Sequence, residues 1–149
     1  MSTVQVTKEI DAPVKQVWDT VMNPDRLGDW VTIHRSVKEV SNKPLSQGST
    51  MEQVLHMRGI SFTVRWTLTR VDEPHYAEWE GRGPANSRAL IRYALSGNDD
   101  GPTRFEYTNE FTPPGGRLGG VASRVIVGAA SEREATKTLT QLKELVENE

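Results

Sequence analysis

Residues 60–71 constrain the fold most, because apolar and polar side chains alternate along them. Phe62, Val64, Trp66 and Leu68 occupy one parity, and mostly threonine and arginine occupy the other. This period of two predicts a long β-strand with one dry face and one solvated face. A sheet of this kind needs a second layer over its apolar face. The one long helical pattern that could cover it lies near the C-terminus.

Turn-forming residues divide the segment from Ile33 to Thr112 into six strands, and the spacing suits antiparallel hairpins. The turns are expected at residues 42–44, 58–59, 72–74, 83–84 and 97–102. An earlier strand ends near Ile10. Two short helices should follow it, one opened by Asp11–Pro13 with Asp11 as its cap and one by Asn23 and Pro24.

From Arg117 to about Val146 the pattern predicts one long helix with an apolar stripe. The stripe comprises Leu118, Val121, Ala122, Val125, Ala129, Leu139, Leu142 and Val146. The first half of this helix is rich in glycine and alanine, although glycine disfavours helix by about 1 kcal/mol relative to alanine. Two interpretations remain open: the small side chains leave room for a ligand, or the helix bends at Gly128.

Composition limits the classes of function. The 149 residues fit a single domain spanning 1–149, and the net charge of −2 lacks the clustered basic charge of a nucleic-acid-binding protein. The absence of cysteine excludes disulfides and thiol nucleophiles. We see no signal peptide, and the longest small and apolar run falls short of the ~20 residues of a membrane span. We therefore expect a cytoplasmic protein without stable membrane insertion.

The inward-facing side chains predict a pocket for a small hydrophobic molecule, because they are mostly apolar with a few polar groups. The predicted ligand-binding residues are Gln53, Leu55, Phe62, Val64, Trp66, Trp79, Ile91, Tyr93, Tyr107, Asn109, Phe111, Val125 and Ala129. The alternative is a filled core in which each polar group hydrogen-bonds to a neighbour.

Catalysis would need a proton donor and an acceptor in that pocket. Glu132 is the candidate base, because helical spacing from Val125 places it on the apolar face. His34 and Tyr107 are candidate donors. A small rotation of the helix would put Glu132 in water instead. The three histidines show no zinc-binding spacing, and no nucleotide motif appears, so we expect neither a metal nor a cofactor.

Several segments resemble the SRPBCC or START-like superfamily of polyketide cyclases, dehydrases and lipid carriers. They are Ile10–Val14 with Val17-Trp18, then Asn23 to Trp30, and the closing Leu139-Thr-Gln-Leu142. The resemblance covers essentially the whole chain. It implies an α+β helix-grip fold, with a seven-stranded curved antiparallel sheet, two short helices after the first strand and a long C-terminal helix. It is weak for activity, since this superfamily hosts carriers, enzymes and regulators on one scaffold.

A narrower resemblance involves Trp30 to Arg35, Arg58-Gly59 and Arg65 to Thr67. These segments are similar to an actinobacterial SRPBCC subgroup known as toxins of type II toxin–antitoxin pairs.

The predicted pocket and the superfamily resemblance together lead us to expect a protein that binds a lipid, polyketide or aromatic molecule between sheet and helix. The alternatives are a cyclase or dehydratase and a toxin component. The exposed strand face could pair with a protein partner or a second copy of the chain.

Overall fold

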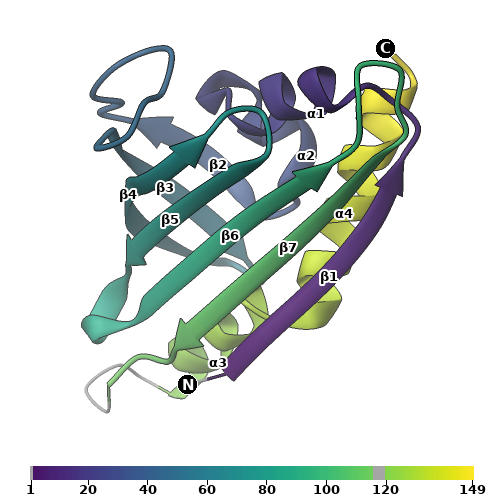
Figure 1. Ribbon diagram of the computed structural model, residues 1–149. Helices are drawn as coiled ribbons and strands as arrows, with labels where there is room; N and C mark the ends of the chain where they lie inside the picture. The colour runs from purple at the N-terminus through teal and green to yellow at the C-terminus, as the bar shows by residue number, and fades with distance from the viewer. Residues whose placement is uncertain (1, 116–119) are drawn as a thin grey trace.

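The computed structural model describes residues 2–115 and 120–149. Its centre is a curved sheet of seven antiparallel strands in the order β1-β7-β6-β5-β4-β3-β2 (Figure 1). The strands are β1 (Ser2–Ile10), β2 (His34–Lys38), β3 (Thr50–Met57), β4 (Ile60–Asp72), β5 (Tyr76–Arg82), β6 (Arg88–Ser96) and β7 (Thr103–Thr112). The helices are α1 (Val14–Val21), η1 (Pro24–Arg26), α2 (Leu27–Trp30), η2 (Pro84–Asn86), α3 (Gly120–Ala129) and α4 (Glu132–Glu147). The expected α+β helix-grip fold is confirmed.

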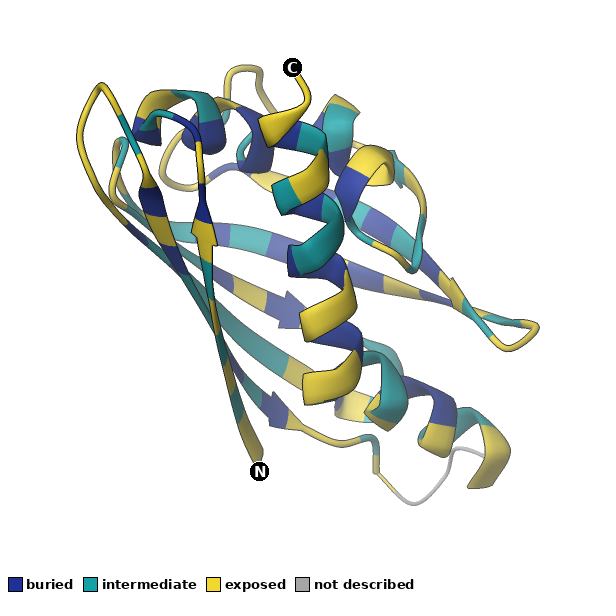
Figure 2. Ribbon diagram, turned by 90° about the vertical axis from the view of Figure 1, so that its right-hand side faces the viewer, coloured by how far each residue is buried: buried dark blue, intermediate teal, exposed yellow. Residues whose placement is uncertain are grey.

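The helical layer contacts the sheet unevenly. Helix α4 packs along β1 and against α2, whereas α3 contacts β4 (Figure 2). The helices therefore pass over the inner face of the central strands while making their main contacts with β1, β4 and α2.

The C-terminal segment forms two helices that are interrupted just after Gly128, close to the position at which the sequence left a bend open. Helix α3 ends at Ala129, and α4 begins at Glu132 after Ser131, whose hydroxyl accepts a hydrogen bond from the Glu134 backbone N–H at 3.2 Å. A serine whose side chain accepts a hydrogen bond from the backbone N–H three residues later is a typical N-cap, so a new helix begins after Ser131. The predicted residues 117–118 lie outside the described residues.

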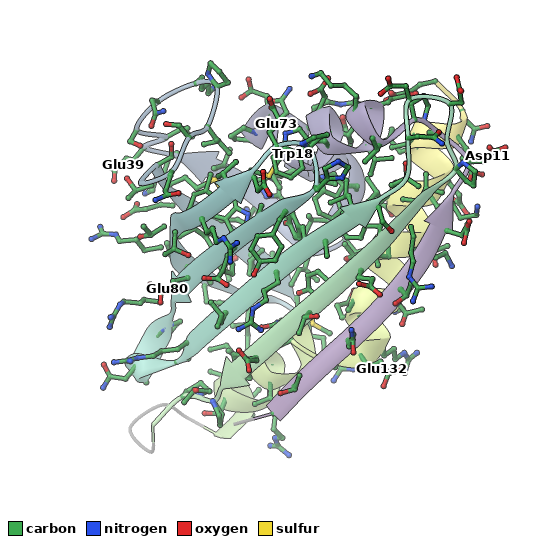
Figure 3. All side chains as sticks on the ribbon, in the orientation of Figure 1. Asp11, Trp18, Glu39, Glu73, Glu80 and Glu132 are labelled. Atoms are coloured by element: carbon green, nitrogen blue, oxygen red, sulfur yellow. The ribbon has the colours of Figure 1, made fainter. Side chains whose placement is uncertain are left out.

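The two short helices begin differently. Asn23 caps η1 as expected, since its Oδ1 accepts from the Asp25 N–H at 3.0 Å and Pro24 follows. Asp11 does not cap α1. Its backbone N–H instead donates to Glu147 Oε2 on α4, and Pro13 occupies the cap position without a side-chain bond. A hydrogen bond fixes the Trp18 side chain, because its Nε1 donates to Glu73 Oε1 at 2.9 Å (Figure 3).

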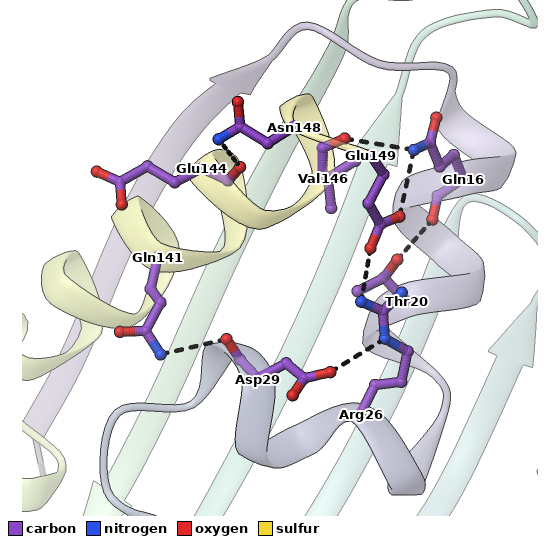
Figure 4. Close-up of polar contacts among 9 residues, drawn as sticks. All are labelled: Gln16, Thr20, Arg26, Asp29, Gln141, Glu144, Val146, Asn148 and Glu149. Atoms are coloured by element: carbon purple, nitrogen blue, oxygen red, sulfur yellow. Dashed lines mark hydrogen bonds and ion pairs between the residues drawn. The ribbon is translucent and has the colours of Figure 1, made fainter.

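The C-terminal end of α4 is held to these helices by polar contacts (Figure 4). Arg26 pairs with Asp29 and with Glu149, and Gln16 Nε2 donates to the Val146 carbonyl at 3.3 Å. Together with the burial of Val146, these contacts fix one end of α4.

The strand faces follow the predicted alternation. On β4 the apolar residues Phe62, Val64, Trp66 and Leu68 are all buried. The outer face carries cross-strand ion pairs, as when Arg92 bridges Glu78 at 3.3 Å and Glu110 at 3.1 Å. The arginines of this face are thus interleaved with acidic partners.

Candidate functional site

A cavity of about 140 Å³ lies between the sheet and the helices. Its wall is mainly apolar and aromatic and draws on every layer of the fold. Strands β3 to β7 contribute Gln53, Trp66, Trp79, Ile91, Tyr107 and Phe111, and the helices contribute Trp30, Ile126, Ala129 and Glu134. Ala89, Ile91 and Tyr107 point inward yet are only half-buried, so the cavity is not fully closed.

Two tryptophans shape the sheet side of the cavity. The rings of Trp66 and Trp79 meet edge to face, with centroids 6.5 Å apart and planes at 77°. Trp66 lies over Gly81 on the neighbouring strand, where a Cβ atom would come within 2.5 Å of the indole. Glycine at position 81 therefore lets a large ring approach β5 closely.

Gln53 connects Trp66 to His34. Trp66 Nε1 donates to Gln53 Oε1 at 2.9 Å, and Gln53 Nε2 lies 2.9 Å from His34 Nδ1. An indole N–H can only donate, so Gln53 Oε1 is an acceptor and its Nε2 must donate. His34 Nδ1 is then the acceptor, which makes the ring neutral with its proton on Nε2.

The position of His34 agrees with that protonation state. Its ring lies beside α2, where a Cβ on Gly28 would be 3.4 Å from Cδ2. Burial lowers the pKa of His34, because it penalises the charged imidazolium. His34 supports Gln53 from behind the cavity wall and does not itself line the cavity.

Two tyrosines occupy the opposite side. Tyr93 packs against Trp30 with centroids 6.2 Å apart and against Tyr107 at 6.4 Å. Burial raises the pKa of Tyr93, and it raises the pKa of Tyr107 to about 12, partly offset by the nearby Asn109 amide. Both phenols therefore stay protonated at neutral pH and can donate hydrogen bonds.

The buried carboxylate of α4 is Glu134 rather than Glu132. Glu134 is 8 % exposed and lines the cavity, and its Oε2 accepts a hydrogen bond from Thr32 Oγ1 at 2.6 Å. Thr138 Oγ1 lies 3.1 Å from the same Thr32 hydroxyl. Glu132 is exposed (Figure 3). Thr136 is exposed as well. The helix restart at Ser131 produces this rotation, so Glu132 has no place in the cavity wall.

Three buried polar atoms of the wall lack a hydrogen-bond partner among the residues that the structure describes. They are Trp30 Nε1, Trp79 Nε1 and Asn109 Oδ1. The three side chains are 1 %, 4 % and 4 % exposed. Buried polar groups are normally paired, so each unpaired atom needs an explanation.

The structure places the predicted ligand-binding residues on the cavity wall, except Val125. Val125 is buried, but its neighbour Ile126 faces the cavity instead. Contact of these residues with a ligand stays a prediction. Among the catalytic candidates, Tyr107 lies on the wall, His34 lies behind it and Glu132 lies in solvent.

Trp30 and Glu134 line the cavity but were absent from the predicted ligand-binding residues. Trp30 follows Leu27 by three on a very short helix, and the sequence left two places open for it, packing of the helix pair under the end of the sheet or a contribution to the pocket mouth. Glu134 had a usable signal, because Ser131-Glu-Arg-Glu134 has the spacing of a capping box, which marks a helix start.

Within residues 2–115 and 120–149, no three His, Cys, Asp or Glu side chains gather closely enough to hold a metal ion. No helix in that part of the chain has the length and apolar character needed to cross a membrane.

Comparison with known proteins places this geometry in context. Over 150 residues the chain is 25 % identical to an uncharacterized protein of Mycobacterium tuberculosis, which covers 97 % of this chain and 99 % of that protein. A toxin of the same organism is 22 % identical over 83 residues, 56 % of this chain and 58 % of the toxin. The Zhui aromatase/cyclase from Streptomyces sp. R1128 shares the fold, with a TM-score of 0.76 and 17 % identity over 99 % of this chain and 94 % of that one.

A family model supplies the assignment. The model for "Polyketide cyclase / dehydrase and lipid transport" matches residues 1–147, nearly the entire chain. That extent includes every strand and helix that forms the cavity. The chain therefore belongs to the polyketide cyclase/dehydrase and lipid transport family.

Proposed function

We propose that this protein binds a small hydrophobic molecule of lipid, polyketide or aromatic type in the cavity between the sheet and helices α3 and α4. The observation that carries this proposal is the cavity itself. Its apolar and aromatic walls enclose about 140 Å³ without filling it. Well-packed interiors leave few voids larger than a water molecule, so a void of this size suggests a site.

Small residues of the helical layer support this reading. Ala129, Ala130 and Ala135 line the cavity where larger side chains would fill it. The helix therefore gives up apolar burial at this place. Such a loss is expected where the missing contacts are supplied by a ligand.

The test begins with native mass spectrometry of the purified protein, followed by denaturation and identification of any released molecule. A cavity-filling variant, Ala129→Leu, should lose the bound molecule. Val127→Leu is the matched control, because Val127 lies on the same helix but is 47 % exposed. Equal retention in both variants would show that the molecule binds elsewhere.

A second candidate function, cyclase- or dehydratase-type catalysis, is favoured by Glu134. A buried carboxylate on the wall of an apolar cavity can take a proton from carbon beside a ketone. In a dehydration, Glu134 would take that proton while the β-hydroxyl leaves as water with a proton from Tyr107 or Tyr93. The double bond forms between the two carbons, and no oxidant is needed.

This candidate is tested with a simple β-hydroxyketone, 4-hydroxy-4-phenylbutan-2-one, whose dehydration to the conjugated enone changes its ultraviolet absorbance. Enone formation that is lost in Glu134→Gln and kept in Glu132→Gln would support catalysis. Equal rates in both variants would argue for binding alone.

A further inference from the structure

The three unpaired polar atoms of the cavity wall restrict the chemistry of its ligand. An indole N–H is only a donor, and a carboxamide oxygen is only an acceptor. Leaving a buried polar atom unpaired costs about 1–3 kcal/mol. A purely hydrocarbon ligand would leave Trp79 Nε1 and Asn109 Oδ1 dry at that cost, whereas a hydroxyl can both accept and donate.

Sheet register places two of these atoms on either side of one residue. Trp79 on β5 pairs with Ile91 on β6, and Ile91 pairs with Asn109 on β7. The three side chains therefore share the inner face, and the outer two strands are ~9.6 Å apart at the usual strand spacing. Ile91 is only half-buried although it points inward. The space above Ile91 thus lies between the residue that carries an unpaired donor, Trp79, and the residue that carries an unpaired acceptor, Asn109.

The cavity volume restricts the size of the ligand. A cavity of about 150 Å³ in another protein accepts benzene. The 140 Å³ available here matches one six-membered aromatic ring. Aromatic side chains such as Trp66, Trp79 and Tyr93 around it favour edge-to-face contacts with a ring.

Charge restricts the ligand further. The charged side chains among the described lining residues are Arg88, which is exposed, and Glu134, which is buried. The interior therefore offers a carboxylate and no buried cation. An anionic head group would lose its hydration without gaining a counter-charge.

We propose that the cavity binds a neutral hydroxylated aromatic ring, a phenol, whose hydroxyl pairs with Asn109 Oδ1 and Trp79 Nε1 above Ile91. This inference rests on the proposed binding function and specifies its ligand class. The ring occupies the enclosed volume, and any remaining part of the molecule extends toward the half-buried Ala89 and Tyr107. Trp30 Nε1 is available to a second oxygen on the ring.

The experiment compares 4-methylphenol with toluene, which differs from it by one hydroxyl, and with 4-methylbenzoate, which is anionic. Isothermal titration of the purified full chain should give at least about tenfold tighter binding of 4-methylphenol than of toluene, a difference of about 1.4 kcal/mol. The benzoate should not bind. Two-dimensional NMR should show the Trp79 indole N–H signal shifting with 4-methylphenol and far less with toluene.

Variants test the assignment of atoms. Asn109→Leu removes the acceptor, and Trp79→Phe removes the donor while keeping a ring. Each should reduce the preference for 4-methylphenol to less than about threefold, the loss of one hydrogen bond. Ile91→Leu is the matched control, because it alters the same row of side chains without touching a polar atom. It should keep the full preference.

The outcomes separate the ligand class from the binding function. Equal affinity for toluene and 4-methylphenol, or a preference that survives in both variants, would overturn the phenol assignment and leave the binding function standing. If no aromatic probe binds, while mass spectrometry identifies an aliphatic molecule that the parent protein carries and the Ala129→Leu variant lacks, the phenol assignment alone fails. If nothing binds and nothing is released, both fail.

Discussion

The indole of Trp66 covers Gly81 so closely that a Cβ on residue 81 would lie 2.5 Å from Cζ3 and 2.7 Å from Cε3. The ring is held on its other side by the hydrogen bond from Nε1 to Gln53. A side chain at position 81 therefore competes with a ring that cannot move without breaking that bond.

We expect Gly81→Ala to lower the free energy of unfolding by about 1–3 kcal/mol, the usual cost of overpacking a core. The measurement is urea denaturation followed by tryptophan fluorescence. Gly120→Ala is the control, since a Cβ there meets nothing within 4 Å. Its stability should stay within about 1 kcal/mol of the parent. If both variants behave alike, Trp66 does not lie over Gly81 in solution.

His34 makes stability depend on pH in a defined direction. Burial lowers its pKa below the ordinary value of 6.5, so the unfolded chain takes up the proton at a higher pH than the folded protein. The free energy of unfolding is therefore highest above about pH 6.5 and decreases as the pH falls below it. Urea titrations at several pH values should show this slope, and His34→Gln should lack it.

The pH range in which His34 changes stability lies above the range in which the acidic side chains titrate. Folding lowers the pKa of Glu52, Glu78, Glu147 and Glu149 below 4.5, so their contribution is present above that value and is lost only in stronger acid. Measurements above about pH 5.5 isolate the histidine.

Replacing Gln53 tests the hydrogen-bonded chain behind that slope. In Gln53→Glu a carboxylate can accept from both Trp66 Nε1 and a protonated His34. The pKa of His34 should then rise above 6.5, because an opposite charge favours the imidazolium. NMR titration of the histidine ring measures it directly. A pKa that stays below 6.5 would mean that the side chain at position 53 does not contact His34 in solution.

Glu134 and Glu132 form a natural pair for comparison, because they lie two residues apart with one buried and one exposed. Glu134→Ala removes the acceptor of the Thr32 hydroxyl, and we expect a loss of about 1–3 kcal/mol. Glu132→Ala should cost less than about 1 kcal/mol, the size of its interaction with the helix dipole. Thermal unfolding of both variants measures the two losses, and a larger loss in Glu132→Ala than in Glu134→Ala would contradict the burial of Glu134.

Ser131 should contribute stability as the cap of α4. Removing its hydroxyl in Ser131→Ala should cost about 1 kcal/mol, whereas Ser131→Asp retains a capping oxygen and should match the parent. Thr136→Ala, an exposed site on the same helix, should change stability by less than about 0.5 kcal/mol. Equal stabilities for the alanine and aspartate variants at position 131 would argue against the cap.

The sheet could be predicted closely because its signal is direct. Along β4 each residue's parity decides whether it faces the core, so Phe62, Val64 and Trp66 were placed from the sequence alone. Side chains of a strand point alternately to the two faces of the sheet, so one buried apolar residue fixes the direction of all the others. The cavity wall on the sheet side follows from that alternation.

The helical wall was harder to predict, because the rotation of a helix about its axis decides which of its residues face the cavity. Continuing the spacing from Val125 through an unbroken helix puts Glu132 on the inner face. The interruption before Ser131 resets the rotation and brings Glu134 and Thr138 inward instead. The place of Trp30 stayed open for a related reason: a helix of four residues is too short to show which face is buried.

The interruption at Ser131 also separates two helices that are anchored to different extents. Helix α4 is pinned by β1, by α2 and by the Arg26–Glu149 pair, whereas α3 contacts β4 and leaves Val121 62 % exposed. Segments with few buried contacts open locally at a free energy below that of global unfolding. We expect native-state hydrogen exchange to run faster in α3 than in α4. A local opening of α3 would then displace Ile126 and Ala129 from the cavity wall while the sheet and α4 keep their protection.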